Sequence, residues 1–138
     1  MPRAIFLPAL AMVTLTAIVW GRMFVVRIGE MKRERIHPQS VATSAQIAAR
    51  LSDTRASDNF RNLFELPVLF YLALCLAAIA GLATTTTLLL AWLFVILRVA
   101  HSAIQCTVNK VMHRFQAYLA SSVVLWMLWA WIGYLLLR

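Results

Sequence analysis

Long apolar runs alternate with short polar segments along the whole chain. Four of these runs have the roughly 20 residues that a helix needs to cross the hydrocarbon core of a bilayer. With the polar residues that lead into them, they predict helices over about 4–26, 57–82, 84–108 and 115–137. We therefore expect an all-α protein, with a single transmembrane domain over residues 1–138. Its four helices are expected to form a left-handed, up-and-down bundle in the membrane.

The polar segments between these runs differ greatly in length. The first, about residues 28–56, is polar and contains the turn signal HPQS at Pro38. The residues after this turn include helix formers but no glycine or proline up to Phe60, so the second helix is expected to begin before the lipid. The second connector is little more than the region of Gly81, which predicts a tight hairpin. The third connector lies near residues 109–113.

The composition agrees with a membrane protein and not with a soluble domain. Of 138 residues, 62% are hydrophobic and 13% charged, and the mean hydropathy is +0.79. A soluble domain carries about a quarter charged residues. The first run resembles a signal peptide in position only, because it is long and no A-x-A site closes it. We interpret it as a retained helix.

The net charge of +8 is concentrated in the first connector and its flanks. Eight basic residues fall between positions 22 and 61: Arg22, Arg27, Lys32, Arg33, Arg35, Arg50, Arg55 and Arg61. Because basic loops between apolar spans face the cytoplasm, this distribution favours anionic lipid headgroups over nucleic acid as the partner.

The same charge pattern predicts the orientation of the chain. Connectors one and three hold ten of the thirteen Lys and Arg residues, and connector two holds none. Both termini are therefore expected on the non-cytoplasmic side of a multi-pass protein, and we expect that membrane to be a bacterial inner membrane. The two cysteines, Cys75 and Cys106, lie in apolar surroundings and indicate packing, with no metal site predicted.

Polar residues on the third helix form a stripe that an ordinary membrane anchor does not need. Arg98 lies ten residues before Val108, which is about 15 Å along a helix. An arginine at that depth costs at least about 2.5–3.5 kcal/mol, so it is expected to face a partner or water. His101, Gln105 and Asn109 follow at spacings of 3, 4 and 4, which places all four on one face.

A second polar stripe lies on the second helix. Asn59, Asn62 and Glu65 are three residues apart, and Arg55 lies one turn earlier. Because helices two and three are antiparallel neighbours, we expect Glu65 and Arg98 to reach similar depths and form an ion pair.

Simpler readings of these two charges stay open. Glu65 has Arg61 four residues before it as an alternative partner on the same helix, and Arg98 has the alternative of snorkelling to the interface. Pro67 is expected to kink the second helix and to free a backbone carbonyl near Leu63 for the polar region.

The fourth helix opens with Arg114 and places Tyr118 one turn deeper. Three helices thus bring polar groups to the same half of the membrane beside a basic loop. This convergence predicts a pocket for an anionic polar ligand, whose co-substrate arrives through the lipid. Each residue also has a structural alternative: His101 as a packed polar side chain, Arg114 as a headgroup anchor. Trp126, Trp129 and Trp131 are expected to be lipid-facing or interfacial aromatics.

Two segments, RASDNFRNLFELP and RVAHSAIQCTVNKVMHRFQAY, resemble the superfamily of membrane-associated proteins in eicosanoid and glutathione metabolism (MAPEG). This family includes microsomal glutathione transferases, leukotriene synthase and prostaglandin E synthase. In the third and fourth helices the spacing of prostaglandin E synthase falls on Arg98, His101, Gln105, Arg114 and Tyr118. Gln105 replaces a family tyrosine, and Phe115 stands where that enzyme has a serine.

In the second helix the family has an arginine, an asparagine, a glutamate and a proline, and two registers fit. One register uses Asn62, Glu65 and Pro67 but puts Asp58 at the arginine position. The other uses Arg55 and Asn59 and puts Asn62 at the glutamate position. Both registers stay open at this point.

The resemblance implies a homotrimer with glutathione, as co-substrate, held between protomers near the cytoplasmic face. It implies that Arg114 stabilises the thiolate, which attacks a lipophilic electrophile or reduces a peroxide. The residues implied to hold the tripeptide are Arg55, Asn59, Asn62, Glu65, Arg98, His101, Gln105 and Tyr118, with Arg22 or Arg27 as a further carboxylate contact.

Two rival functions remain. The first is a non-catalytic membrane protein of the same fold that binds a lipid or a partner. The second is a small multidrug transporter, which needs a titratable acid at mid-membrane, usually on its first helix. The first helix has no acid before Glu30, which disfavours the transporter.

Overall fold

The computed structural model describes residues 2–138, and all of its regular elements are helices. In chain order they are η1 (Pro2–Ile5), α1 (Phe6–Arg33), η2 (Pro38–Val41), α2 (Ser44–Arg50), α3 (Arg55–Asn62), α4 (Leu66–Ile79), α5 (Thr85–Cys106) and α6 (Val111–Leu137).

Four helical stretches in the described part of the chain are long and apolar enough to cross a membrane: Arg3–Arg33, Arg55–Ile79, Thr85–Cys106 and Val111–Leu137. These four stretches confirm the predicted spans. The second span is interrupted, because α3 and α4 are separate helices. It was predicted as one helix over 57–82, with a kink at Pro67.

The first helix extends further than its apolar run. We predicted an end near residue 26, but α1 continues to Arg33, and the left-handed conformation of Arg35 (φ 52°) follows it. At 1.5 Å per residue its 28 residues span about 42 Å, against about 30 Å for the hydrocarbon core. The apolar run therefore marks the membrane depth and not the helix end. Lys32 and Arg33 in the last turn suit the negative end of the helix dipole.

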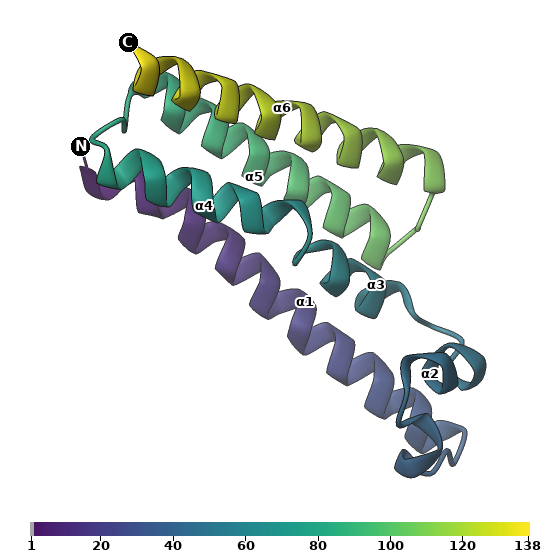
Figure 1. The fold of residues 1–138 in the computed structure, drawn as a ribbon. Helices are drawn as coiled ribbons and strands as arrows, with labels where there is room; N and C mark the ends of the chain where they lie inside the picture. Colours follow the sequence, from purple (N-terminus) through teal and green to yellow (C-terminus); the bar gives the residue numbers. More distant parts are fainter. Residues whose placement is uncertain (1) are drawn as a thin grey trace.

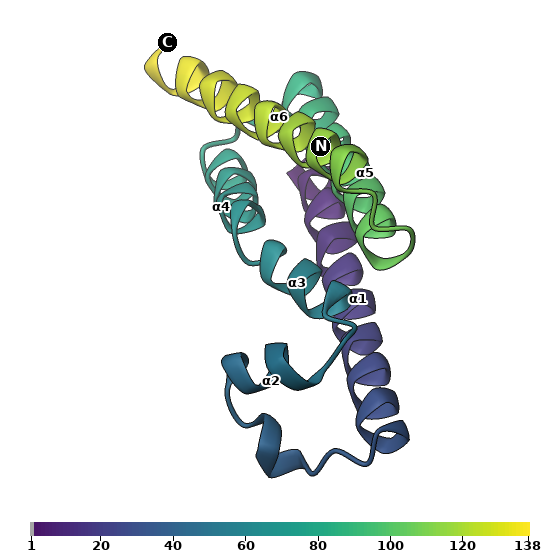
Figure 2. The same ribbon diagram turned by 90° about the vertical axis from the view of Figure 1, so that its right-hand side faces the viewer.

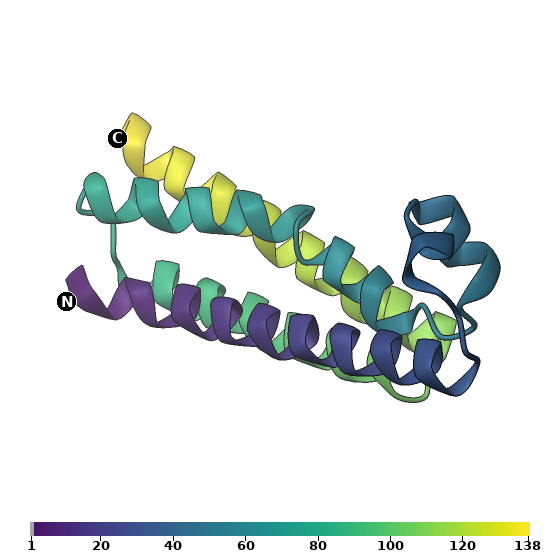
Figure 3. The ribbon, with the colours of Figure 1, turned by 90° about the horizontal axis from the view of Figure 1, so that it is seen from below.

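The helices run up and down, side by side, as a four-helix bundle (Figure 1). Helix α1 packs against α3 and α5, and α6 packs against α5 and α4 (Figure 3). Both termini lie at one end of the bundle, and the connector with η2 and α2 lies at the other end beside the last turns of α1 (Figures 1 and 2).

The turn between α4 and α5 is as tight as predicted. Gly81 adopts φ +69°, a conformation that glycine enters without steric cost. The amides of Gly81 and Leu82 bond to the carbonyls of Ala78 and Ala77, so that α4 ends in a Schellman motif. Thr84 then caps α5 by accepting from the amide of Thr87.

The long connector is attached to α1 by the buried carboxylate of Glu30. One oxygen accepts from both the amide and the hydroxyl of Ser52, at 2.6 Å each, and the other accepts from the amide of Asp53 at 3.3 Å. These bonds hold the residues before α3 against the last turns of α1. The sequence analysis did not assign this role to Glu30.

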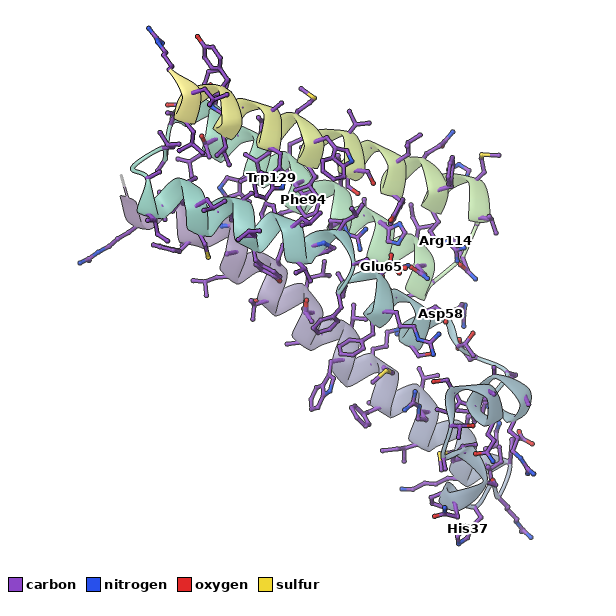
Figure 4. The ribbon with its side chains drawn as sticks, in the orientation of Figure 1. His37, Asp58, Glu65, Phe94, Arg114 and Trp129 are labelled. Carbon is purple, nitrogen blue, oxygen red and sulfur yellow. The ribbon has the colours of Figure 1, made fainter. Side chains whose placement is uncertain are left out.

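The apolar core lies between the helices in the half of the bundle nearer the termini. Phe70 of α4 stacks on Phe94 of α5, with ring centroids 4.5 Å apart. Ala73, Ala77 and Ala91 are fully buried beside them, and these small side chains let the helix backbones approach closely. Figure 4 shows Phe94 and Trp129 in this half, with Glu65 and Arg114 nearer the other end.

Candidate functional site

A hollow of about 200 Å³ lies where the broken second span faces the junction of α5 and α6. Its walls are Asn62, His101, Val111, Arg114, Phe115 and Tyr118. Four of these six residues belong to the predicted site, and they come from three different helices. The convergence of polar groups that the sequence predicted is therefore present in the fold.

The break between α3 and α4 forms one wall of this region. Pro67 has no amide hydrogen and its ring excludes a continuous helix through the preceding turn, so the chain bends at Leu63–Glu65 before α4 begins. In an unbroken helix the carbonyl of Asn62 would accept from the amide of Leu66. Here it accepts instead from Nη2 of Arg98, at 2.8 Å. The missing amide of Pro67 leaves the carbonyl of Leu63 without its helical donor, and the bend also releases the carbonyl of Asn62, which is the one that bonds to Arg98.

Arg98 is completely buried, as its depth predicted. Its guanidinium carbon lies 5.6 Å from the centre of the Tyr118 ring, within the range of a cation–π contact. Within residues 2–138, Nε and Nη1 of Arg98 have no hydrogen-bond partner. Arg98 therefore links the helix break to the aromatic wall of the hollow and does not snorkel.

The predicted ion pair between Glu65 and Arg98 is wrong, as is the alternative pair of Glu65 with Arg61. The ion pairs within residues 2–138 are Arg33–Glu34 and Arg55–Asp53. Glu65 lies in the break itself, at the start of α4, where its backbone is not helical and its side chain is exposed (Figure 4). Because the helix is interrupted there, the one-turn spacing to Arg61 no longer places the two side chains together.

His101 connects the hollow to the interior of the bundle. Nδ1 lies 3.0 Å from the backbone oxygen of Arg114, and Nε2 lies 2.9 Å from the side-chain oxygen of Gln105, which also accepts from Asn62 at 3.1 Å. Since a carbonyl oxygen only accepts, Nδ1 carries a proton. In this arrangement both ring nitrogens donate. A neutral ring would instead require Gln105 to turn its NH₂ group to Nε2, and Asn62 to turn its oxygen to Gln105. The protonation of His101 is therefore linked to whether Asn62 turns its NH₂ group or its oxygen toward Gln105, and so to which of the two is left for the hollow.

Arg114 lies at the mouth of the hollow, at the start of α6 (Figure 4). Its side chain is half-buried, and Nη1 donates to the side-chain oxygen of Asn109 at 2.7 Å. Asn109 was expected on the same helix face as Arg98, but α5 ends at Cys106 and Asn109 adopts φ 47° in the following turn. Asn109 nevertheless belongs to the site, because its side-chain oxygen orients the guanidinium of Arg114.

Arg55 and Asn59 are placed outside the hollow. Asn59 is buried against α5, where its amide donates to the sulfur of Cys106 at 3.4 Å and its oxygen accepts from Ser102 at 3.2 Å. Arg55 donates to both carboxylate oxygens of Asp53 and to the backbone oxygen of Thr107. This guanidinium lowers the pKa of the Asp53 carboxyl group below its ordinary value. The register that uses Asn62, Glu65 and Pro67 therefore has its asparagine at the hollow, whereas the register that uses Arg55 and Asn59 does not.

Arg22 was expected near the end of the first helix, predicted at about residue 26, but α1 continues for three more turns beyond Arg22. Its Nη2 donates to the backbone oxygen of Cys106 at 2.7 Å. Arg22 and Arg55 therefore both donate to backbone carbonyl groups at the C-terminus of α5, and these carbonyls have no donor within the helix. Arg27 lies further along α1, facing Leu51 and Thr54 of the connector.

Two apolar walls of the hollow, Val111 and Phe115, were not predicted from the sequence. Phe115 was noted only as a departure from a family serine. A signal for both was available, since residues 111, 114, 115 and 118 share one face of a helix. Val111 was not considered, because the helix was predicted to begin at residue 115, whereas α6 begins at Val111.

Three comparisons with known proteins bear on this site. A model of the MAPEG family matches residues 5–134, which is nearly the whole chain and includes every residue of the hollow. No curated protein and no solved structure matches it.

Proposed function

Because the chain belongs to the MAPEG family, and is thus an integral membrane protein, we propose that it is a glutathione-dependent transferase or peroxidase acting on lipophilic electrophiles. The observation that carries this proposal is the position of Arg114. Its guanidinium lines a hollow beside His101 and Asn62, and no carboxylate within residues 2–138 pairs with it. A cation held at a hollow without an internal counter-ion suits an anionic ligand.

The chemistry that Arg114 would support is stabilisation of a thiolate. A guanidinium close to a thiol favours its charged form and so lowers the pKa of the thiol. The thiol proton would leave to solvent, and the thiolate sulfur would attack the electrophilic carbon. A carbon–sulfur bond forms while the bond from that carbon to its leaving group breaks, and the leaving group departs with the electron pair. With a hydroperoxide the sulfur would take the terminal oxygen to give a sulfenic acid, while the oxygen–oxygen bond breaks and an alcohol is released. A second glutathione thiol then displaces water from the sulfenic acid to give the disulfide.

The remaining site residues would bind the rest of the tripeptide. Asn62 and His101 offer amide and imidazole groups at the hollow, and Tyr118 forms its inner wall. At about 200 Å³ the hollow is smaller than the roughly 300–1,000 Å³ of ordinary ligand pockets. We therefore propose that the ligand extends beyond this hollow and is covered by a neighbouring copy, as in the homotrimer that the resemblance implies.

The other part of the proposed site concerns Arg55, Asn59 and Glu65. Arg55 and Asn59 already have partners within the chain, so their role in binding would require those partners to be exchanged. Glu65 is exposed at the break and needs no exchange to reach a ligand amine.

We also propose that the end of the bundle with the hollow lies at the cytoplasmic face, with both termini on the other side of the membrane.

A non-catalytic role for the same site is the second candidate. Its supporting observation is the loss of two hydroxyl groups relative to the family pattern. Gln105 replaces a tyrosine, and Phe115 lines the hollow in place of a serine. A hollow with fewer donors for a thiolate is better suited to binding a lipid or a partner than to activating a thiol.

Absorbance of the thiolate in the ultraviolet distinguishes these two functions. We expect purified protein in detergent to show thiolate absorbance when glutathione is added, and Arg114→Ala to lose it. Arg61→Ala, which removes an exposed arginine outside the hollow, is the matched control and is expected to keep it. Binding of glutathione by calorimetry without thiolate absorbance would support the non-catalytic role, and absence of binding would overturn the proposal.

A further inference from the structure

Positive charge gathers where α1 leaves the bundle and the connector folds back beside it. The region from Arg27 to Asp53 contains three carboxylates, and each has a partner within the chain. Glu30 is buried and accepts from Ser52 and Asp53. Glu34 pairs with Arg33 at 2.9 Å, and Asp53 pairs with Arg55 at 2.8 Å.

The other cations of this region have no such compensation. We name them the basic platform: Arg27, Lys32, Arg35 and Arg50. Within residues 2–138 none of the four forms an ion pair, and all but the half-buried Arg27 are exposed. Glu34 and Asp53 are already paired with arginines, and Glu30, whose donors are neutral, offsets only one of the four charges. The platform therefore keeps a net positive charge.

The attachment of the connector to Glu30 brings the platform together. Arg27 and Lys32 lie within three residues of Glu30 on α1, which is less than about 5 Å along the axis. Ser52 is bonded to Glu30, and Arg50 precedes it by two residues. Arg27, Lys32 and Arg50 are therefore at similar heights along α1, and Arg35 follows Lys32 by three residues. They act together on an approaching anion.

The apolar side chains beside the platform indicate the class of that anion. Val25 and Ile28 precede Lys32 by seven and four residues on α1, so the three side chains share one face of the helix. Val25 and Ile28 have 74% and 47% of their surface exposed. Exposed apolar side chains next to an uncompensated cation fit a molecule with an acyl chain beside an anionic head. A nucleic acid or a free phosphate offers no partner for Val25 and Ile28.

We propose that the basic platform binds phospholipids with anionic headgroups, and that this site is separate from the hollow at Arg114. Basic residues next to a membrane span bind such lipids with about 1 kcal/mol each, which is about a fivefold change in affinity. This inference does not depend on the proposed catalytic function, because none of the platform residues lines the hollow.

Native mass spectrometry of the full chain, released from detergent micelles with added lipid, tests the proposal. We expect phosphatidylglycerol to bind more tightly than phosphatidylcholine. Lys32→Gln with Arg35→Gln is expected to weaken phosphatidylglycerol binding about 25-fold, from two factors of about five. Equal binding of the two lipids would overturn the proposal.

Two control variants separate the platform from net charge and from neighbouring arginines. Arg3→Gln with Arg138→Gln removes the same charge at the far end of the bundle, and it is expected to leave binding within about twofold. Arg33→Gln with Glu34→Gln removes an internal pair without changing the net charge, and the same result is expected. An equal loss in either control would contradict the assignment of Lys32 and Arg35.

Inorganic phosphate distinguishes a lipid from a free anion. At the same concentration as phosphatidylglycerol it is expected not to displace the lipid, because it makes no contact with Val25 and Ile28. Displacement by phosphate would show that the platform is a site for small anions and would overturn the proposal.

Discussion

On one side of Pro67, α4 and α5 pack through the Phe70–Phe94 stack and small alanines, and on the other side α3 and α5 meet through hydrogen-bonded side chains. Both contacts involve the same continuous helix α5. The apolar half relies mainly on close packing, with Trp131 of α6 donating to the hydroxyl of Thr84, the N-cap of α5, at 3.3 Å. The polar half adds Arg98 and Gln105, which bond to Asn62 of the broken span, and His101, which bonds to Gln105 and to the backbone oxygen of Arg114 on α6.

The difference shows how one bundle provides both stability and a site. Between helices in lipid there is little hydrophobic driving force, so close packing and interhelical hydrogen bonds hold the bundle together. The break at Pro67 opens the second span and supplies an uncommitted carbonyl, which the buried Arg98 needs. The polar half is therefore possible because the adjoining apolar half fixes the positions of the helices.

The largest loss of stability is expected from the apolar half. Phe94→Ala removes a fully buried ring and its stack on Phe70, at a cost of about 3–5 kcal/mol by comparison with other buried phenylalanines. Thermal unfolding of the detergent-solubilised protein measures this cost. Ile96→Ala, on the exposed face of the same helix, is the control and is expected to change stability by less than about 0.5 kcal/mol. Similar losses in the two variants would show that the stack does not hold the bundle.

An intermediate loss is expected from the polar network. Gln105→Leu leaves His101 Nε2 and the Asn62 amide without their shared partner, and each unpaired buried group costs about 1–3 kcal/mol. Equilibrium unfolding measures the change, with Gln116→Leu on the exposed face of α6 as the control. If Gln105→Leu were as stable as the parent protein, the network would not contribute to the polar half.

The smallest change in stability, within about 1 kcal/mol, is expected from removing the break. Pro67→Ala restores an amide that can bond to the carbonyl of Leu63, and a continuous helix would also return the Asn62 carbonyl to Leu66. Arg98 would then lose its acceptor, and Asn62 would shift in the hollow.

Hydrogen exchange measures this change directly. We expect slower exchange over residues 63–68 in Pro67→Ala, together with weaker thiolate absorbance on adding glutathione. Pro38→Ala in the connector is the matched control and is expected to change neither signal. Unchanged exchange over 63–68 would show that the break does not depend on the proline.

The broad plan of the fold could be predicted from local patterns. Four apolar runs give four spans, and the spacing of Arg98, His101 and Gln105 gives one buried face, because helix periodicity depends only on neighbouring residues. The proline likewise predicts a break wherever it occurs. The end of α1 was predicted less well, since hydropathy reports the depth of the membrane and not the last hydrogen bond of a helix.

The partners of the polar groups could not be predicted in the same way. Whether Arg98 meets Glu65 or the Asn62 carbonyl depends on how far the second span unwinds and how it rotates against α5. A small shift of the span changes which group Arg98 meets. Asn59 and Asn62 show the same dependence, because Asn59 is buried against Cys106 whereas Asn62 lines the hollow.

The sequence by itself determined that this protein crosses a membrane four times and carries a buried polar face with Arg98 on its third span, because hydrophobicity and helical spacing are properties of short stretches. Only the tertiary structure decided which of these groups share a hollow and which serve as caps at the end of α5. Such contacts depend on the depth and rotation of whole helices, which many weak packing interactions set together.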